Sequence, residues 1–128
     1  MQKIVFTFMA FLFSGMLIAQ VTLEKTYNYS SAVVKFETLG YKYYVMDVPN
    51  SQCRIYNLDH SIFKTINCSV PSNCYLADIK YLSENLFDND SGIELIYTWY
   101  KYIPTQDAYY YEYDSKIINE DGSAITTI

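Results

Sequence analysis

The sequence predicts an all-β fold of two tandem four-stranded antiparallel meanders, each like one blade of a β-propeller. Three observations predict this fold: a segment that occurs twice, a composition with 15 tyrosines and many β-branched residues, and turn signals that separate short alternating runs. A two-sheet β-sandwich is the alternative arrangement of the same strands. A signal-peptide helix is expected at the N-terminus, ahead of the sheets.

The doubled segment relates Arg54–Ile66 to Lys116–Ile128 without a gap. The identical pairs are Ile55/Ile117, Asn57/Asn119, Asp59/Asp121, Ser61/Ser123, Thr65/Thr127 and Ile66/Ile128. In both copies an alternating run is interrupted by Asn-x-Asp-x-Ser, and the residue before Ser is His60 in the first copy and Gly122 in the second. Glycine, and less commonly histidine, accepts the positive φ that a tight hairpin turn requires. We therefore expect two hairpins with the same turn.

The first repeat is expected to span residues 21–66. Its polar beginning, Thr22–Tyr29, is either a short strand or a leader. Four strands follow, and turn residues such as Leu39-Gly40 and Pro49-Asn50-Ser51 separate them. In chain order these strands are Ala32–Glu37, Tyr41–Val48, Cys53–Asn57 and Ser61–Ile66. The last two strands form the first hairpin.

Residues 67–75, which include Pro71, form a linker, and the second repeat spans residues 76–128. Its expected strands are Leu76–Leu82, Ile93–Tyr102, Tyr109–Asn119 and Ser123–Ile128. A short helix over Ala77–Phe87 is the competing interpretation of the first of them. The sequence stops at Ile128, the counterpart of Ile66, where the first copy continues into its linker. We therefore expect the second repeat to be truncated and the chain to be the front part of a longer protein, or else to pair with another partner.

Residues 1–20 have the organisation of a secretory signal peptide: Lys3, an uncharged apolar run over Ile4–Ala19, and a small residue before the expected cut. The apolar run is shorter than the roughly 20 residues that span a bilayer. The chain carries a net charge of −5, and removal of Lys3 makes it more negative. Because nucleic acids and anionic lipid surfaces attract basic patches, neither is an expected partner. The protein is expected to be secreted or to lie at the cell surface, with no membrane contact beyond the signal peptide.

The chain has three cysteines, an odd number for an exported protein. Cys68 and Cys74 flank a turn-rich connection and could close a small disulfide loop. Three thiols packed as small apolar side chains are the alternative. This second interpretation is favoured for Cys53, because its counterpart in the repeat is Ser115.

No catalytic residue is expected. His60 is the single histidine, so a Ser-His-Asp or Cys-His arrangement would have to use it. Its counterpart in the repeat is Gly122, which favours a structural role in a turn. The sequence also lacks a phosphate loop, a Cys/His metal cluster and a dinucleotide fingerprint. We therefore predict that the chain is not an enzyme.

One acidic turn could hold calcium, and no other cofactor is expected. Asp88, Asp90 and Glu94 place carboxylates at alternate positions, as loops for hard cations do. The EF-hand pattern fails here, because Ile93 and Trp99 stand where it requires glycine and glutamate. The alternative interpretation is a solvated turn between two strands.

An aromatic group near the C-terminal end could stack on sugar rings. It consists of Trp99, Tyr100, Tyr102, Tyr109, Tyr110, Tyr111 and Tyr113. Of these, the candidate ligand contacts are Trp99, Tyr100, Tyr102 and Tyr110. Because alternation divides the group between two sheet faces, most of it is expected to lie in the core between the sheets.

Four segments resemble repeats of secreted bacterial proteins that the type IX secretion system exports. They are Tyr41–Asp47, Ile55–Ser61, Leu86–Asp90 and Lys116–Gly122. The resemblance implies propeller-like repeats and, in the full-length protein, passage through the type IX secretion machinery. The Gly-rich C-terminal sorting domain of that family does not occur in this sequence.

Together these observations predict a secreted, non-catalytic β-repeat module. It would act as a scaffold or adhesion segment, or bind a glycan or protein ligand. The alternative function is that of the N-terminal blades of a secreted propeller hydrolase whose active site lies in further sequence.

Overall fold

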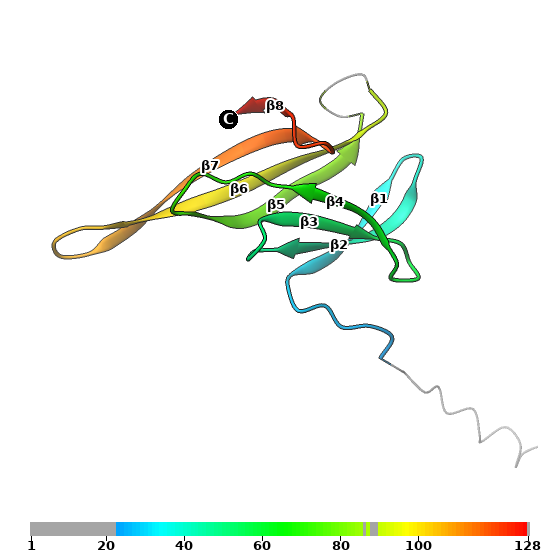
Figure 1. Cartoon of the computed structure of the whole chain (residues 1–128), viewed down its shortest axis with the longest axis horizontal. Helices are drawn as coiled ribbons and strands as arrows, with labels where there is room; N and C mark the ends of the chain where they lie inside the picture. The colour runs from blue at the N-terminus through cyan, green and yellow to red at the C-terminus, as the bar shows by residue number, and fades with distance from the viewer. Residues whose placement is uncertain (1–22, 86, 88–89, 128) are drawn as a thin grey trace, which may run out of the picture.

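The computed structural model describes residues 23–127 except 86, 88 and 89. Two four-stranded antiparallel sheets follow each other along the chain, in the orders β1-β2-β3-β4 and β5-β6-β7-β8 (Figure 1). The first sheet contains β1 (Ser31–Phe36), β2 (Gly40–Asp47), β3 (Gln52–Tyr56) and β4 (Ile62–Asn67). The second contains β5 (Cys74–Glu84), β6 (Ile93–Pro104), β7 (Tyr109–Asn119) and β8 (Ala124–Thr127).

The predicted all-β class and the two four-stranded meanders are confirmed. The competing helix over Ala77–Phe87 is wrong, because β5 is a strand that pairs with β6 as far as Glu84. Residues 23–30 form no strand and therefore match the leader interpretation. The signal peptide, residues 1–20, lies outside the described residues. Within the described residues, no helix has the length and apolar character that crossing a membrane requires.

The two repeat hairpins have the same turn, down to individual hydrogen bonds. Asn57 and Asn119 each receive a bond on the backbone oxygen, from the N–H of His60 (3.0 Å) and of Gly122 (2.9 Å). The φ angles of these two residues are 66° and 86°. The carboxylates of Asp59 and Asp121 accept the next serine N–H at 2.9 Å and 2.8 Å. The sequence identities thus specify one turn twice.

A β-bulge also recurs at the same place in both hairpins. Pairing of β3 with β4 slips after Ile55, and pairing of β7 with β8 slips after Ile117, its counterpart. The extra residues are Phe63 in β4 and Ile125 in β8. A bulge bends its strand and increases its twist, so the two sheets share a local shape as well as a sequence.

One hydrophobic core joins the two sheets. The buried members are Phe36, Cys53, Ile55, Ile66 and Cys68 from the first half, and Leu76, Ile79, Leu82, Ile93, Leu95, Tyr97, Trp99 and Ile118 from the second. Both sheets therefore bury one face against the other.

The repeat allows the faces of the two sheets to be compared. We call the front face the side that carries Cys53 and Ile55 in β3, and their counterparts Ser115 and Ile117 in β7. Cys53 and Ile55 belong to the shared core, whereas Ser115 and Ile117 do not. Instead, Ile118 of β7 belongs to it, on the opposite, back face. The front face of the first sheet therefore packs against the back face of the second.

The segment Thr26–Tyr29 covers part of the back face of the first sheet, next to Val45, Asp47, Arg54 and Tyr56. The ring of Tyr27 lies 5.1 Å from that of Tyr56 and 6.3 Å from that of Tyr43. Its hydroxyl contacts Nδ1 of His60 at 2.9 Å. Beneath this segment, Val45 is only 4% exposed although it lies outside the shared core. The leader thus buries Val45, while Val33 and Tyr41 on the same face stay exposed.

Polar contacts also tie the two halves together. The Glu84 carboxylate accepts bonds from Thr38, at 2.8 Å from its N–H and 2.7 Å from its hydroxyl. Burial alone would raise the pKa of Glu84, but these bonds outweigh burial and lower the pKa. Lys64 of β4 forms an ion pair with Glu120 after β7, and the Tyr97 hydroxyl donates to the backbone oxygen of Ser69 at 2.7 Å.

Substitution of Tyr97 by Phe tests this tie. The side chain is fully buried, so loss of the hydroxyl leaves the Ser69 oxygen without that donor and is expected to lower the free energy of unfolding by about 1 kcal/mol at pH 7. Burial, with the nearby Cys68 thiol, raises the pKa of Tyr97 to about 12. The unfolded chain loses this proton near pH 10. The wild-type advantage over Tyr97→Phe should therefore be full below pH 10 and shrink toward pH 12. Urea denaturation at several pH values measures it, and a constant difference across that range would contradict the assignment.

Candidate functional site

Six tyrosines lie together on the front face of the second sheet. They are Tyr75 of β5, Tyr100 and Tyr102 of β6, and Tyr109, Tyr111 and Tyr113 of β7. The strand register places Tyr100 opposite Tyr113 and Tyr102 opposite Tyr111, while Tyr75 lies opposite Tyr100 on its other side. We call this set the tyrosine face. It exists because alternation within each strand coincides with pairing between strands.

The rings of the tyrosine face contact one another continuously. From Tyr100 the ring centroids of Tyr75, Tyr111 and Tyr113 are 5.5, 5.3 and 6.0 Å away. Tyr102 contacts Tyr109 at 5.5 Å and Tyr111 at 5.9 Å. These separations fall within the range of favourable aromatic pairs. Burial among neighbouring rings, and the charges that Tyr109 and the others would carry, raise the pKa of Tyr111.

The tyrosine face is open to solvent. Five of its members are between 46% and 62% exposed, and Tyr100 at its centre is half-buried. The expectation that most of the aromatic group lies in the core is therefore wrong for all but Trp99, which is 8% exposed and packs between the sheets. Tyr110 is exposed on the other side of the hairpin. Among the predicted contacts, the structure thus brings together Tyr100 and Tyr102, but neither Trp99 nor Tyr110 joins them.

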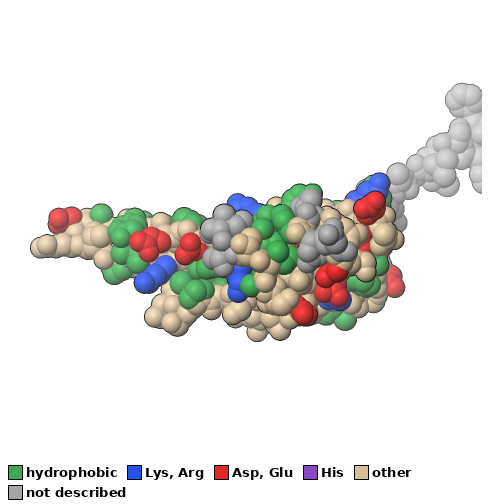
Figure 2. Space-filling model, turned by 90° about the horizontal axis from the view of Figure 1, so that it is seen from above, with side chains coloured by type: hydrophobic (Ala, Val, Ile, Leu, Met, Phe, Trp, Pro, Cys, Tyr) green, Lys and Arg blue, Asp and Glu red, His purple; other side chains and the backbone are tan. Residues whose placement is uncertain are grey.

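Part of this face lies on an arm formed by residues 102–111. Pairing of β6 with β5 ends at Lys101, whereas pairing of β6 with β7 continues to the Pro104–Tyr109 pair. The hairpin consequently projects beyond the rest of the molecule (Figure 1). Figure 2 shows this narrow end with hydrophobic side chains along it and acidic side chains among them.

A groove adjoins the tyrosine face. Its volume is about 620 Å³, and Thr98, Tyr100, Tyr113 and Ser115 line one part of it. The hydroxyls of Thr98 and Ser115 lie 2.9 Å apart. Aromatic rings beside hydroxyl groups can stack on one part of a ligand and hydrogen-bond to another.

The candidate calcium residues do not form one site in the described part of the chain. Asp88 lies outside the described residues. Glu94 is fully buried and accepts the Phe87 N–H at 2.7 Å, whereas Asp90 is exposed and accepts the Gly92 N–H at 2.7 Å. In the region that the structure describes, no group of three His, Cys, Asp or Glu side chains is placed to hold a metal ion.

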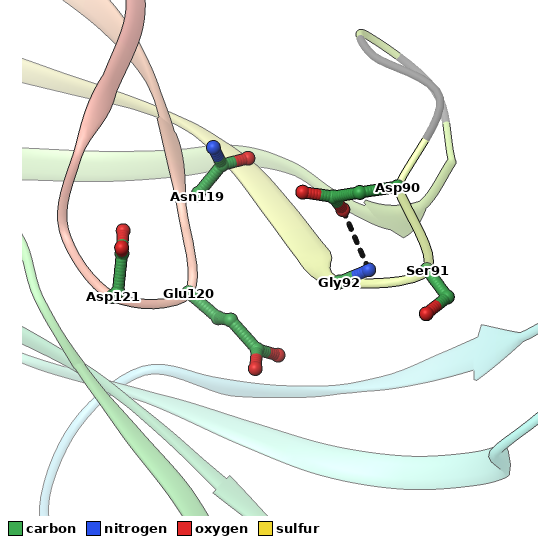
Figure 3. A pocket seen from close by; sticks show the side chains of 6 residues that line it. All are labelled: Asp90, Ser91, Gly92, Asn119, Glu120 and Asp121. Carbon is green, nitrogen blue, oxygen red and sulfur yellow. Dashed lines mark hydrogen bonds between the residues drawn. The ribbon is translucent and has the colours of Figure 1, made fainter.

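Asp90 instead faces the second repeat turn. Figure 3 shows Asp90, Ser91 and Gly92 across a pocket of about 410 Å³ from Asn119, Glu120 and Asp121. Burial raises the pKa of Glu120, but the bond from Lys64 and the Ile93 N–H outweigh it and lower the pKa. Sequence reasoning missed this juxtaposition, because it depends on the path of the β5–β6 connection.

The structure joins none of the three cysteines in a disulfide. Cys53 and Cys68 are buried in the shared core, and burial raises the pKa of both thiols, that of Cys68 to about 12. Cys74 is half-buried at the start of β5. The pairing of Cys68 with Cys74 stays a prediction from the sequence.

His60 is engaged by its neighbours. It occupies the turn position with positive φ, and its ring stacks on that of Tyr43 at 5.2 Å with an interplanar angle of 11°. Its Nε2 lies 3.4 Å from a carboxylate oxygen of Glu24. The histidine therefore anchors the leader segment to the first hairpin.

Comparison of the chain with protein-family models, with curated proteins and with solved structures finds no match. The resemblance to type IX secretion cargo stays an expectation from the sequence.

Tyr100→Ala is expected to loosen the arm without unfolding the core. The substitution removes three ring contacts, each worth about 0.5–1.5 kcal/mol. Amide hydrogen exchange in residues 102–111 should become about tenfold faster or more, while exchange at Leu95 and Ile118 should hardly change. Tyr81→Ala is the matched control, since Tyr81 is exposed on the same sheet face but outside the tyrosine face. Equal effects of the two substitutions would contradict a role of the ring contacts.

Proposed function

We propose that the chain is a secreted, non-catalytic β-repeat module that binds neutral glycans through the tyrosine face. The observation that carries the proposal is the set of six mutually contacting rings on one open sheet face, beside a groove. This set uses Tyr100 and Tyr102 from the predicted contacts and adds Tyr75, Tyr109, Tyr111 and Tyr113.

Ring chemistry supports a sugar ligand. A tyrosine presents an apolar ring and a hydroxyl at its tip, which matches the apolar ring face and hydroxyl rim of a pyranose. Two aromatic residues on one side of a strand are about 6.8 Å apart, and the centroids of Tyr109 and Tyr111 are 5.8 Å apart. A row of such rings can contact successive sugar units of a chain.

Charge supports a neutral ligand. The front positions of the arm are Tyr102 and Pro104 in β6 and Tyr109 and Tyr111 in β7, all of them uncharged. The chain as a whole has a net charge of −5, which repels anionic polysaccharides at low ionic strength. Neutral plant-type or microbial glucans, xylans and mannans are the ligand class that fits.

The packing of the repeats supports a blade-like stack. In the described residues, the front of one sheet packs on the back of the next, the relation that propeller blades and other stacked repeats share. A sandwich whose halves are related by a two-fold axis would instead bury the same face of both. The proposal also includes export of the chain through the type IX secretion machinery and a location outside the cell.

Affinity electrophoresis with soluble glucan, xylan and galactomannan tests the function. We expect at least one of these polysaccharides to retard the wild-type chain. Tyr102→Ala and Tyr111→Ala should each weaken binding about tenfold, the equivalent of ~1.4 kcal/mol.

Two other exposed tyrosines serve as controls. Tyr41→Ala, in the first sheet, should leave binding unchanged. Tyr110→Ala reports on the opposite side of the arm. Absence of retardation by every polysaccharide, or a loss in Tyr110→Ala as large as that in Tyr111→Ala, would refute the proposed surface.

A further inference from the structure

The strand β7 has a long edge without a strand partner in the described part of the chain. It pairs with β6 from Tyr109 to Asn119. On its other side it pairs with β8 only at Lys116, Ile117 and Ile118. Residues 109–114 are all exposed. An exposed strand edge is a template for the addition of another strand.

The hydrogen-bonding direction along this edge follows from the second hairpin. Asn119 directs both its N–H and its oxygen toward β8, to Ser123 and Gly122. Since the pairing of β6 with β7 has no register shift, every second residue before Asn119 points the same way. The backbone groups of Tyr109, Tyr111 and Tyr113 therefore point to the free edge.

Two features at the tip of the arm agree with this direction. Pro104 has no N–H and lies opposite Tyr109, so this pair cannot exchange two hydrogen bonds, and the Tyr109 N–H is free to point outward. The next pair does bond, because the Thr105 N–H donates to the Ala108 oxygen at 2.8 Å. Three residues thus offer three donors and three acceptors to an incoming strand.

The acidic side chains beside the free edge of β7 favour a partner strand with basic residues. An added strand would place alternate side chains next to Tyr109, Tyr111 and Tyr113 on the front, and the others next to Tyr110, Glu112 and Asp114 on the back. Glu112 and Asp114 are exposed. A second copy of this chain would bring the same acids against each other, which disfavours self-pairing.

We propose that the free edge of β7 binds an extended polypeptide strand that alternates basic and apolar residues. Its basic residues lie beside Glu112 and Asp114, and its apolar residues lie beside the rings of the tyrosine face. The added strand widens the sheet and extends that face. This inference rests on the backbone edge and the two acids and does not require the face to bind sugars.

Peptide binding to the full chain tests the inference. The probe is a fluorescent eight-residue peptide that alternates lysine and valine, and its control has four lysines followed by four valines. Anisotropy should show tighter binding of the alternating peptide. Its binding should slow amide exchange at Tyr109, Tyr111 and Tyr113.

Two pairs of matched variants separate backbone from side-chain and charge effects. Tyr111→Pro and Tyr111→Ala both remove the ring, but only proline removes the outward N–H, so Tyr111→Pro should bind about fivefold more weakly than Tyr111→Ala. Glu112→Lys should weaken binding more than Asp107→Lys, which makes the same charge change in the turn at the tip of the arm.

Several results would overturn the inference: no binding of the alternating peptide, equal binding of the block peptide, equal affinity of the two Tyr111 variants, or equal effects of the two lysine substitutions. Dimerisation of the wild-type chain through the β7 edge would overturn the requirement for a basic partner.

Glu112→Lys is also assayed with the polysaccharides. Since it leaves the tyrosine face intact, loss of peptide binding with retained sugar binding distinguishes this edge from the proposed function.

Discussion

The packing of the front of one sheet on the back of the next is the constraint on which the structure depends. A head-to-tail contact buries different faces of two similar units, so it always leaves one front and one back unmatched. In the described residues, the unmatched back belongs to the first sheet and is partly covered by Thr26–Tyr29. The unmatched front belongs to the second sheet and carries the tyrosines. The location of the candidate site is therefore a consequence of how the repeats stack.

The differences between repeat counterparts follow the same constraint. Cys53 and Met46 pack in or against the shared core, and the residues at the corresponding places on the front of the second sheet are Ser115 and Thr98. The two hydroxyls bond to each other, which satisfies polar groups where Thr98 is only 7% exposed. Ile55 and Ile117, in contrast, are identical and buried at both places.

The sequence predicted what depends on local chemistry. The Asn-x-Asp-x-Ser turn appears twice with the same bonds, because its geometry requires only a residue that accepts positive φ and side chains that bond to nearby backbone. The alignment of His60 with Gly122 likewise predicted a turn position. The helix alternative for Ala77–Phe87 arose from the bulged, irregular pattern of β5, where Ala77 and Lys80 interrupt the register.

The candidate site could be predicted only in part, because alternation assigns residues to two faces without saying which face is covered. Alternation was expected to divide the aromatic group between two faces, and Tyr109, Tyr111 and Tyr113 do lie on one of them. Their exposure depends on the stacking direction, which is a property of contacts between distant segments. The ion pair of Lys64 with Glu120 and the bonds of Thr38 to Glu84 have the same origin. Neither leaves a signal in the neighbouring sequence.

The tyrosines of the arm also have a structural task, which explains their number. A two-stranded hairpin that projects into water is at best marginally stable, and residues 102–111 have neither a third strand nor the shared core beside them. Directly opposite pairs contribute about 0.2–1 kcal/mol each, and Tyr102 with Tyr111 is such a pair. The same rings that stabilise the hairpin thus form the surface it presents. A ligand that stacks on them, or a strand that adds to β7, would further order the arm, so stability and binding are coupled through one set of contacts.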